Sequence, residues 1–326
     1  MSTIRSCARF GLLGIALALS HGVAAQDNPY RTLDNHFSLP GGRVVGSTAG
    51  ITIDRDGSSV WAFERCGAAN CVGSTVAPIL KFDASGKLVT TLGANMFVRP
   101  HGIHVDRDGN VWVTDQEGHQ VVKMSADGRA LMTLGKKGMA GDAVDLFNAP
   151  SAVFVAPDGS IFIGDGHGGT TNARMLKFTK EGKFIRTWGA RGTGPGDFET
   201  PHGIAMDSQG RLFVADRGNN RVQIFDQDGT FLAEWKQFGR PSGIFIRNDM
   251  LYIADHQSDP KTNPGFTKGI RIGSVKDGKV TAFIPDKPDG TQEGVAVDAQ
   301  GNVYGSLTGG PTGAVGGAAL KKYVRR

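Results

Sequence analysis

The chain carries the stretch PHGIHVDRDGNVWVTD at residues 100–115, and this phrase returns as PHGIAMDSQGRLFVAD at residues 201–216. Weaker copies begin near residues 48, 150, 241 and 292. Counted at the third residue of each opening, the six copies lie at 50, 102, 152, 203, 243 and 294, in steps of 52, 50, 51, 40 and 51 residues. A period of about 40 to 50 residues with several short strands per unit is typical of β-propeller blades.

Within each copy the pattern predicts four strands joined by tight turns. In the second copy, a strand at 103–106 is followed by an Asp-Gly turn and a β-rich strand at 111–114. A third strand at 120–124 and an outer strand at 130–134 complete the unit. Strands linked by such hairpin turns form one antiparallel blade. The sequence therefore predicts an all-β fold, a six-bladed β-propeller with four-stranded antiparallel blades and no amphipathic helix.

The two ends of the chain predict how the ring closes. Residues 320–324 match the third strand of a blade, after which the chain stops, so that the last blade lacks its outer strand. Residues 30–37 precede the first copy and have no blade of their own. We expect this N-terminal segment to complete the last blade, because circular closure protects sheet edges that would otherwise be open.

The first 25 residues have the features of a signal peptide. Arg5 and Arg9 precede an apolar run at 11–19, and Val23-Ala24-Ala25 supplies the small residues that a signal peptidase needs. The apolar run is too short to span a bilayer. We expect cleavage near Ala25/Gln26, a propeller over residues 26–326, and a periplasmic or secreted protein without a membrane anchor.

Charge and cysteine content narrow the function classes. Removal of Arg5 and Arg9 lowers the formal charge from +5 to +3, and the remaining basic residues are scattered, so that a nucleic-acid partner is not expected. Cys7 leaves with the signal peptide, whereas Cys66 and Cys71 remain. In an oxidising compartment this pair predicts a disulfide that closes a small loop; a metal site is the poorer interpretation, because no second cysteine pair exists.

One position of the repeated phrase alternates in kind. The middle residue of the three-residue opening is, in chain order, Ala49, His101, Ser151, His202, Ser242 and Glu293. Alternate blades of a six-fold ring lie about 120° apart, so that His101, His202 and Glu293 are placed to converge on the axis. Two imidazoles and a carboxylate suit Zn²⁺ with an open position, or Fe²⁺. The alternative is that the histidines bond to neighbouring backbone and that Glu293 is a solvated rim residue.

Two arginines occupy equivalent places in different blades. Arg65 and Arg217 directly follow Glu64 and Asp216, just after the second strands of blades one and four. Near an axial metal, two guanidinium groups would suit a bidentate grip on a substrate carboxylate. A surface or inter-blade ion pair is the alternative for each arginine.

Two further histidines are candidates for the mouth of the pore. His167 lies in the glycine-rich loop 165–169, where flexibility would carry it over the axis as a general base or acid. The alternative is an exposed loop histidine. His256 follows Asp255 at the place that Arg217 occupies in its own blade. The recurrent carboxylates before these loops are expected to bond to backbone amides and to be structural: Asp115, Asp165, Asp216 and Asp255.

These residues carry a resemblance to a known family. Pro-x-Gly-Ile-x-Val-Asp and the stretch VADRGNNRVQIF at 214–225 resemble NHL repeats. The whole mature chain is similar to peptidyl-α-hydroxyglycine α-amidating lyase, the lyase half of the peptide-amidating enzyme. The most specific matching segments are 63–65, 99–102, 114–121, 201–203 and 215–217.

The resemblance implies a zinc ion held on the axis by three histidines from alternate blades. Two of them match His101 and His202, while the third falls at Glu293, and the family's substrate-binding arginines match Arg65 and Arg217. The catalytic tyrosine of the family falls at His167. A carboxylate that helps to hold a structural calcium in the family corresponds to Gly294, so that calcium is not expected here.

Three functions are consistent with the sequence. The first is an exported metal-dependent lyase that converts α-hydroxyglycine-type amides to an amide and glyoxylate, with a carboxylate-bearing small-molecule or peptide substrate supplied by a separate monooxygenase. The second is a lactone or ester hydrolase at the same axial site. The third is a non-enzymatic NHL propeller that binds a protein, peptide or glycan on one face.

Overall fold

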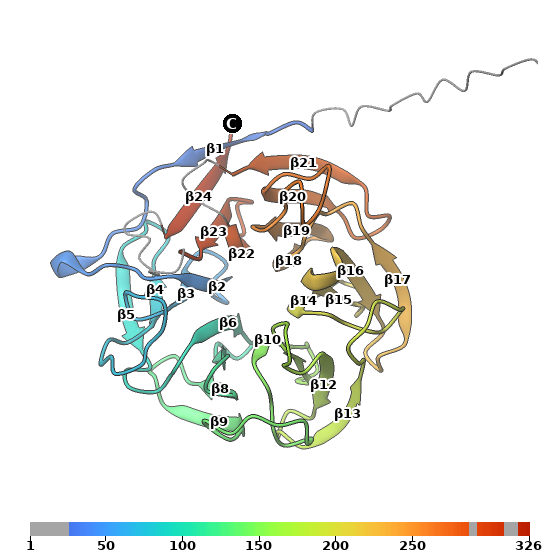
Figure 1. Cartoon of the computed structure of the whole chain (residues 1–326). Helices are drawn as coiled ribbons and strands as arrows, with labels where there is room; N and C mark the ends of the chain where they lie inside the picture. The colour runs from blue at the N-terminus through green and yellow to red at the C-terminus, as the bar shows by residue number, and fades with distance from the viewer. Residues whose placement is uncertain (1–25, 287–291, 310–318) are drawn as a thin grey trace, which may run out of the picture.

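The chain forms one closed ring of six blades in a computed structural model that describes residues 26–286, 292–309 and 319–326 (Figure 1). The predicted signal peptide lies outside the described residues. From the inner to the outer strand, blades one to three are β2 (Thr48–Ile53), β3 (Val60–Glu64), β4 (Ile79–Phe82), β5 (Leu88–Leu92); β6 (Pro100–Val105), β7 (Val111–Asp115), β8 (Gln120–Met124), β9 (Ala130–Gly135); β10 (Pro150–Val155), β11 (Ile161–Asp165), β12 (Arg174–Phe178), β13 (Phe184–Trp188). Blades four to six are β14 (Pro201–Met206), β15 (Leu212–Asp216), β16 (Arg221–Phe225), β17 (Phe231–Trp235); β18 (Gly243–Arg247), β19 (Met250–Asp255), β20 (Gly269–Ser274), β21 (Val280–Pro285); β22 (Gln292–Val297), β23 (Val303–Leu307), β24 (Leu320–Arg325), β1 (Tyr30–Leu33).

The predicted architecture is confirmed. Every pairing inside a blade is antiparallel, and within the described residues the helical elements are two short 3₁₀ turns, η1 (Pro40–Gly42) and η2 (Arg217–Asn219). No helix in the described ranges is long and apolar enough to cross a membrane. The predicted disulfide between Cys66 and Cys71 is present, with their Cα atoms 5.1 Å apart.

The chain ends close the ring as predicted. Strand β1 pairs antiparallel with β24, with Tyr30 opposite Arg325 and Leu33 opposite Lys322 (Figure 1). The strand ends at Leu33, four residues earlier than the predicted segment. The continuation is anchored by Phe37, whose ring lies 4.9 Å from that of Phe82 in blade one. One terminal segment therefore links the last blade to the first.

The hydrophobic core lies between neighbouring blades. Between blades one and two, Trp61 packs with Val113; between blades two and three, Trp112 packs with Ile163. All four side chains are almost completely buried. Burial of apolar surface contributes about 25 cal/mol per Å², and here that stabilisation arises only when adjacent blades are stacked. The ring therefore fixes the relative position of the inner strands.

A β-bulge marks the start of most inner strands. In blade four, Pro201 pairs with Asp216 and Gly203 pairs with Ala215, so that His202 is the additional residue. Blades one, two, three and six show a register shift at the same place. A bulge re-aims the side chain of the additional residue. The alternating position of the repeat is thus the position at which the strand turns a side chain toward the axis.

Carboxylates at the ends of the second strands hold the chain that enters each inner strand. Asp115 accepts hydrogen bonds from the amides of Val98 and Arg99, and Asp216 accepts them from Glu199 and Thr200. Glu64, Asp165 and Asp255 make equivalent bonds in their own blades. The predicted structural role of these aspartates is confirmed.

Blade six departs from this arrangement. Its second strand ends in Leu307, and Asp286, from the preceding loop, accepts the hydrogen bond from the Gln292 amide at 3.1 Å. Burial raises the pKa of Asp286 to about 7. The blade that supplies Glu293 is therefore anchored by a different carboxylate from the other five.

Candidate metal centre

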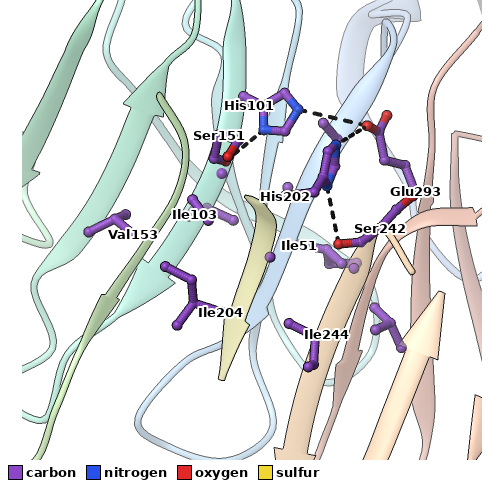
Figure 2. Close-up of a pocket in the computed structure, with 18 residues that line it drawn as sticks. Ile51, His101, Ile103, Ser151, Val153, His202, Ile204, Ser242, Ile244 and Glu293 are labelled. Carbon is purple, nitrogen blue, oxygen red and sulfur yellow. Dashed lines mark hydrogen bonds and ion pairs between the residues drawn. The ribbon is translucent and has the colours of Figure 1, made fainter. Parts of the chain in front are cut away.

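The bulges bring three predicted side chains together on the axis. Nε2 of His202 lies 2.9 Å from Oε1 of Glu293, and Nε2 of His101 lies 3.7 Å from the same oxygen. The two imidazole rings are 4.7 Å apart, and all three side chains are buried. Figure 2 shows them turned toward one another, above a layer of aliphatic side chains. The structure therefore brings His101, His202 and Glu293 into one cluster.

Neighbouring blades fix the tautomers of the two histidines. Nδ1 of His101 is 2.7 Å from the carbonyl oxygen of Ser151, and Nδ1 of His202 is 3.1 Å from that of Ser242 (Figure 2). A carbonyl only accepts, so that each Nδ1 carries the hydrogen. Each Nε2 therefore presents a lone pair to Glu293.

Glycines allow the inner strands to approach closely enough for these bonds. A Cβ on Gly102 would lie 2.6 Å from the Ser151 carbonyl oxygen, and a Cβ on Gly203 would lie 2.7 Å from that of Ser242. These oxygens are the acceptors for His101 and His202. The glycine of the repeated phrase thus supports the orientation of the histidine that precedes it.

The donor atoms fit a metal cation. Nε2 of His101 and of His202 is buried and has no hydrogen-bond partner among the described residues. The short His202–Glu293 contact thus joins two electron-rich atoms without a suitably placed hydrogen. Donors bound at about 2.0–2.1 Å to a tetrahedral ion lie about 3.3 Å from one another, close to the 2.9 and 3.7 Å found here. The cluster could bind a metal.

Burial determines the protonation states of the cluster. Burial, together with the neighbouring His202, lowers the pKa of His101 well below its usual value. Burial and the charge of Arg217 lower the pKa of His202. Burial alone would raise the pKa of Glu293, but His256 and His202 hold it well below its usual range. A carboxylate facing two neutral imidazoles is the resulting charge state, which suits metal ligation.

Arg217 enters the cluster from η2. Its Nη1 lies 3.4 Å from Oε1 of Glu293, and its Nη2 lies 3.2 Å from Nε2 of His167. Its Nε is buried with no hydrogen-bond partner in the described part of the chain. Burial lowers the pKa of Arg217 to about 10, so that the group remains charged at neutral pH. Arg217 therefore keeps an unused donor beside the donor cluster.

Arg65 lies at the matching place in blade one and is also buried. Its Nε donates to the carbonyl oxygen of Pro100 at 3.2 Å, and its Nη1 donates to Oγ of Ser47 at 3.3 Å. Burial lowers its pKa, and the charge of Glu293 partly offsets this effect. Arg65 thus lies within electrostatic reach of the cluster, but no hydrogen bond joins it to His101, His202 or Glu293.

His167 reaches the axis from its glycine-rich loop. Its ring lies 4.8 Å from that of His101 and 5.1 Å from that of His202. Its backbone amide donates to Oγ1 of Thr171 at 2.8 Å. The position over the pore is as the sequence predicted.

The sequence pointed to His256 only by its place, and Ser242 was noted only for its small size. Nδ1 of the buried His256 lies 2.7 Å from Oγ of Ser242, and burial lowers the pKa of His256 to about 3. The carbonyl of Ser242 is the partner of His202. Small residues between the ligand-type positions thus hold the cluster through their backbone. The signal available in the sequence was their occurrence in the blade that follows each histidine.

The lower part of the axial channel is apolar. The residues two positions after the alternating site line it as a second ring: Ile51, Ile103, Val153, Ile204, Ile244 and Val295 (Figure 2). Such side chains offer no ligand to a metal and no partner to a polar substrate. The donor cluster therefore faces one end of the ring.

The comparisons agree with this geometry. The NHL repeat model matches residues 97–124 and 198–225. Peptidyl-glycine alpha-amidating monooxygenase B of Xenopus laevis is 31% identical over 83% of this chain and 34% of its own length, and the probable peptidyl-alpha-hydroxyglycine alpha-amidating lyase pgal-1 of Caenorhabditis elegans is 31% identical over 56% of each chain. NHL repeat-containing protein 3 of Mus musculus is 30% identical over 70% of this chain and 67% of its own length. The gluconolactonase XC5397 of Xanthomonas campestris shares the fold, with a TM-score of 0.63 and 17% identity over 93% of this chain and 92% of that chain.

The fold and the axial cluster define a six-bladed propeller with a candidate metal centre. The chain belongs to the NHL-repeat family. The resemblance to amidating lyases is confirmed, and a carbon–nitrogen lyase is the class of enzyme that its relatives indicate. The chain spans a quarter to a third of the length of the amidating monooxygenases that it matches.

Proposed function

We propose that this protein is a metal-dependent lyase that converts an N-acyl-α-hydroxyglycine to the corresponding amide and glyoxylate. The observation that carries the proposal is the convergence of His101, His202 and Glu293 beside a buried guanidinium with an unused donor, on a propeller related to amidating lyases. Zn²⁺ suits this donor set best, and Fe²⁺ is the second choice. When bound, the metal would act as a Lewis acid for the hydroxyl group of the substrate.

The arginines account for recognition of the carboxylate. Arg217, with its buried Nε unpaired, and Arg65, on the opposite blade, would bind the substrate carboxylate between them. Two guanidinium groups would also orient the carbon that carries the hydroxyl toward the axis. Binding of a carboxylate from both sides would discriminate against substrates that lack one.

His167 would act as the general base. Burial holds its pKa well below the usual value, so that the imidazole is neutral and able to accept a proton. It would take the hydroxyl proton while the carbon–oxygen double bond of glyoxylate forms and the C–N bond breaks. The proton is then delivered to the departing amide nitrogen, so that the products are the amide and glyoxylate and no oxidant is consumed.

The setting of this reaction is proposed on the same basis. A leader at residues 1–25 would export the protein to the periplasm or the medium, and a separate monooxygenase would supply the α-hydroxyglycine substrate, since this chain holds only a lyase-like propeller. Fractionation of the producing cells, with N-terminal sequencing of the mature protein, tests the export; a first residue near Gln26 is expected.

The activity is tested with purified protein whose metal content has been measured. N-benzoyl-α-hydroxyglycine is incubated with the loaded protein, and glyoxylate and benzamide are quantified. Equal amounts of both products support the lyase, and Arg217→Ala should lower kcat/KM with the metal content unchanged. Absence of turnover in fully loaded protein would contradict the proposal; hydrolysis of a lactone under the same conditions would assign the axial site to a hydrolase, and the absence of bound metal would favour a binding protein.

A further inference from the structure

We propose that His167 is itself a metal ligand in the substrate-free protein, which gives a centre of three imidazoles and one carboxylate. This inference rests on the proposed metal site and adds a donor from a loop outside the ring of equivalent positions. The repeat assigns ligands only to the inner strands, and His167 follows the second strand of blade three. The four donors would be His101, His167, His202 and Glu293.

The positions of the rings support a fourth donor. The His167 ring lies 4.8 Å from that of His101 and 5.1 Å from that of His202, while the latter two lie 4.7 Å apart. His167 is therefore as central to the cluster as the two inner-strand histidines. One donor atom from each of these side chains and from Glu293 lies within 4.8 Å of all the others. Four donors of this kind complete the coordination of a tetrahedral ion.

The contact with Arg217 shows which atom of His167 is the donor. A guanidinium group only donates hydrogen bonds, so that Nε2 of His167, 3.2 Å from Nη2 of Arg217, is an acceptor with a lone pair. Nη1 of the same arginine lies 3.4 Å from Oε1 of Glu293. Arg217 thus places one positive charge between two of the four donors. A metal cation would compete with Arg217 for these atoms and leave its guanidinium free for the substrate carboxylate.

The loop is shaped to bring His167 to the axis. Gly166, Gly168 and Gly169 have φ values of 131°, 87° and 61°, which L side chains rarely adopt. A Cβ on Gly166 would collide with the carbonyl group of Asn172. Glycine is therefore required before His167 for the chain to turn over the pore, whereas a flexible exposed loop would not need this close packing.

A ligand and a simple base differ in what their removal does to the metal. If His167 only accepts a proton, replacing it abolishes turnover and leaves metal affinity intact. If it is a ligand, its loss weakens binding and changes the geometry of the ion. A tyrosine at this place, the residue that the resemblance to amidating lyases implies, separates the two roles further, because it supplies a phenol in place of an imidazole.

The test measures metal binding directly. Metal-free wild-type, His167→Ala, His167→Tyr and control His119→Asn proteins are titrated with Zn²⁺ against a chromophoric chelator, and with Co²⁺ to record the visible spectrum. The control alters a histidine outside the cluster and keeps a residue that tolerates the positive φ of 57° at that position. Thermal unfolding of each variant confirms that it is folded.

We expect His167→Ala to lower Zn²⁺ affinity by about 100-fold, since loss of a ligand exceeds the typical 10- to 100-fold effect of losing an outer partner. Its Co²⁺ spectrum should change in intensity and position, and His119→Asn should match the wild type in both. Unchanged affinity and spectrum in His167→Ala, with turnover lost, would overturn the inference and leave the lyase proposal standing. Failure of the wild-type protein to bind either metal would overturn both.

Discussion

The blades that carry ligand-type residues and the blades that carry small residues perform complementary tasks at the same ring of positions. Blades two and four place His101 and His202 on the axis. Blades three and five place Ser151 and Ser242 there, and the carbonyl groups of these serines bind Nδ1 of the two histidines. The small residues therefore do more than leave space, because they fix the tautomer that presents Nε2 to the site. The alternation in the repeat separates ligands from their supports.

Loss of a ligand should have the largest effect on this arrangement. We expect His202→Ala to lower Zn²⁺ affinity by about 1,000-fold, more than the loss of an outer partner, and to abolish glyoxylate release. Competition titration and elemental analysis measure the change. Retention of stoichiometric metal by a folded His202→Ala protein would show that the inner-strand histidine is not a ligand.

Separation of a ligand blade from its supporting blade should come next. In Gly102→Ala the new Cβ would meet the Ser151 carbonyl at 2.6 Å and Oγ1 of Thr114 at 3.0 Å. We expect destabilisation of about 1–3 kcal/mol and a loss of metal affinity of about 10- to 100-fold, because the bond to His101 is strained. Blade three offers a matched control, since Ala152 already occupies the equivalent place and Ala152→Gly should leave metal affinity unchanged. Wild-type binding in Gly102→Ala would separate the glycine from the site.

The anchor of blade six should show its difference from the other blades through pH. The folded-state pKa of Asp286, about 7, lies above the ordinary value of 3.8, so that the folded chain binds this proton more tightly. Stability should therefore fall as pH rises from about 4 to about 7 and stay lowered above that range. Asp286→Asn removes this dependence and keeps an acceptor for the Gln292 amide. We expect the variant to gain about 1–3 kcal/mol relative to wild type between pH 4 and pH 8, as measured by denaturant unfolding; parallel pH profiles would contradict it.

The smallest effect is expected where a side chain is lost and its carbonyl is kept. Ser242→Ala removes the contact with His256 and retains the backbone acceptor for His202. We expect a stability loss of about 1 kcal/mol and less than a tenfold change in Zn²⁺ affinity. A larger drop in affinity would show that the hydroxyl group, and not the carbonyl, controls the orientation of His202.

The fold and the ring of ligands were predictable because they depend on periodicity. The Gly, Asp and β-rich positions recur at a constant spacing, so that His101, His202 and Glu293 could be placed on one axis from residue types alone. The roles of Ser151 and Ser242 could not be found in this way, because a backbone carbonyl is common to every residue. Asp286 was also not foreseen, since its hydrogen bond replaces a carboxylate that the repeat would have put at Leu307.

The pairing of β1 with β24 makes biosynthesis part of how the centre forms. Strand β1 is among the first segments to leave the ribosome, and it must wait for the last strand before the sixth blade has all its strands. That blade carries Glu293, so that the carboxylate donor is in place only when both chain ends have met. Contacts between such distant segments form slowly. A partly made or clipped chain would thus be unable to hold the metal ion tightly, and the cell would be spared a half-built reactive centre.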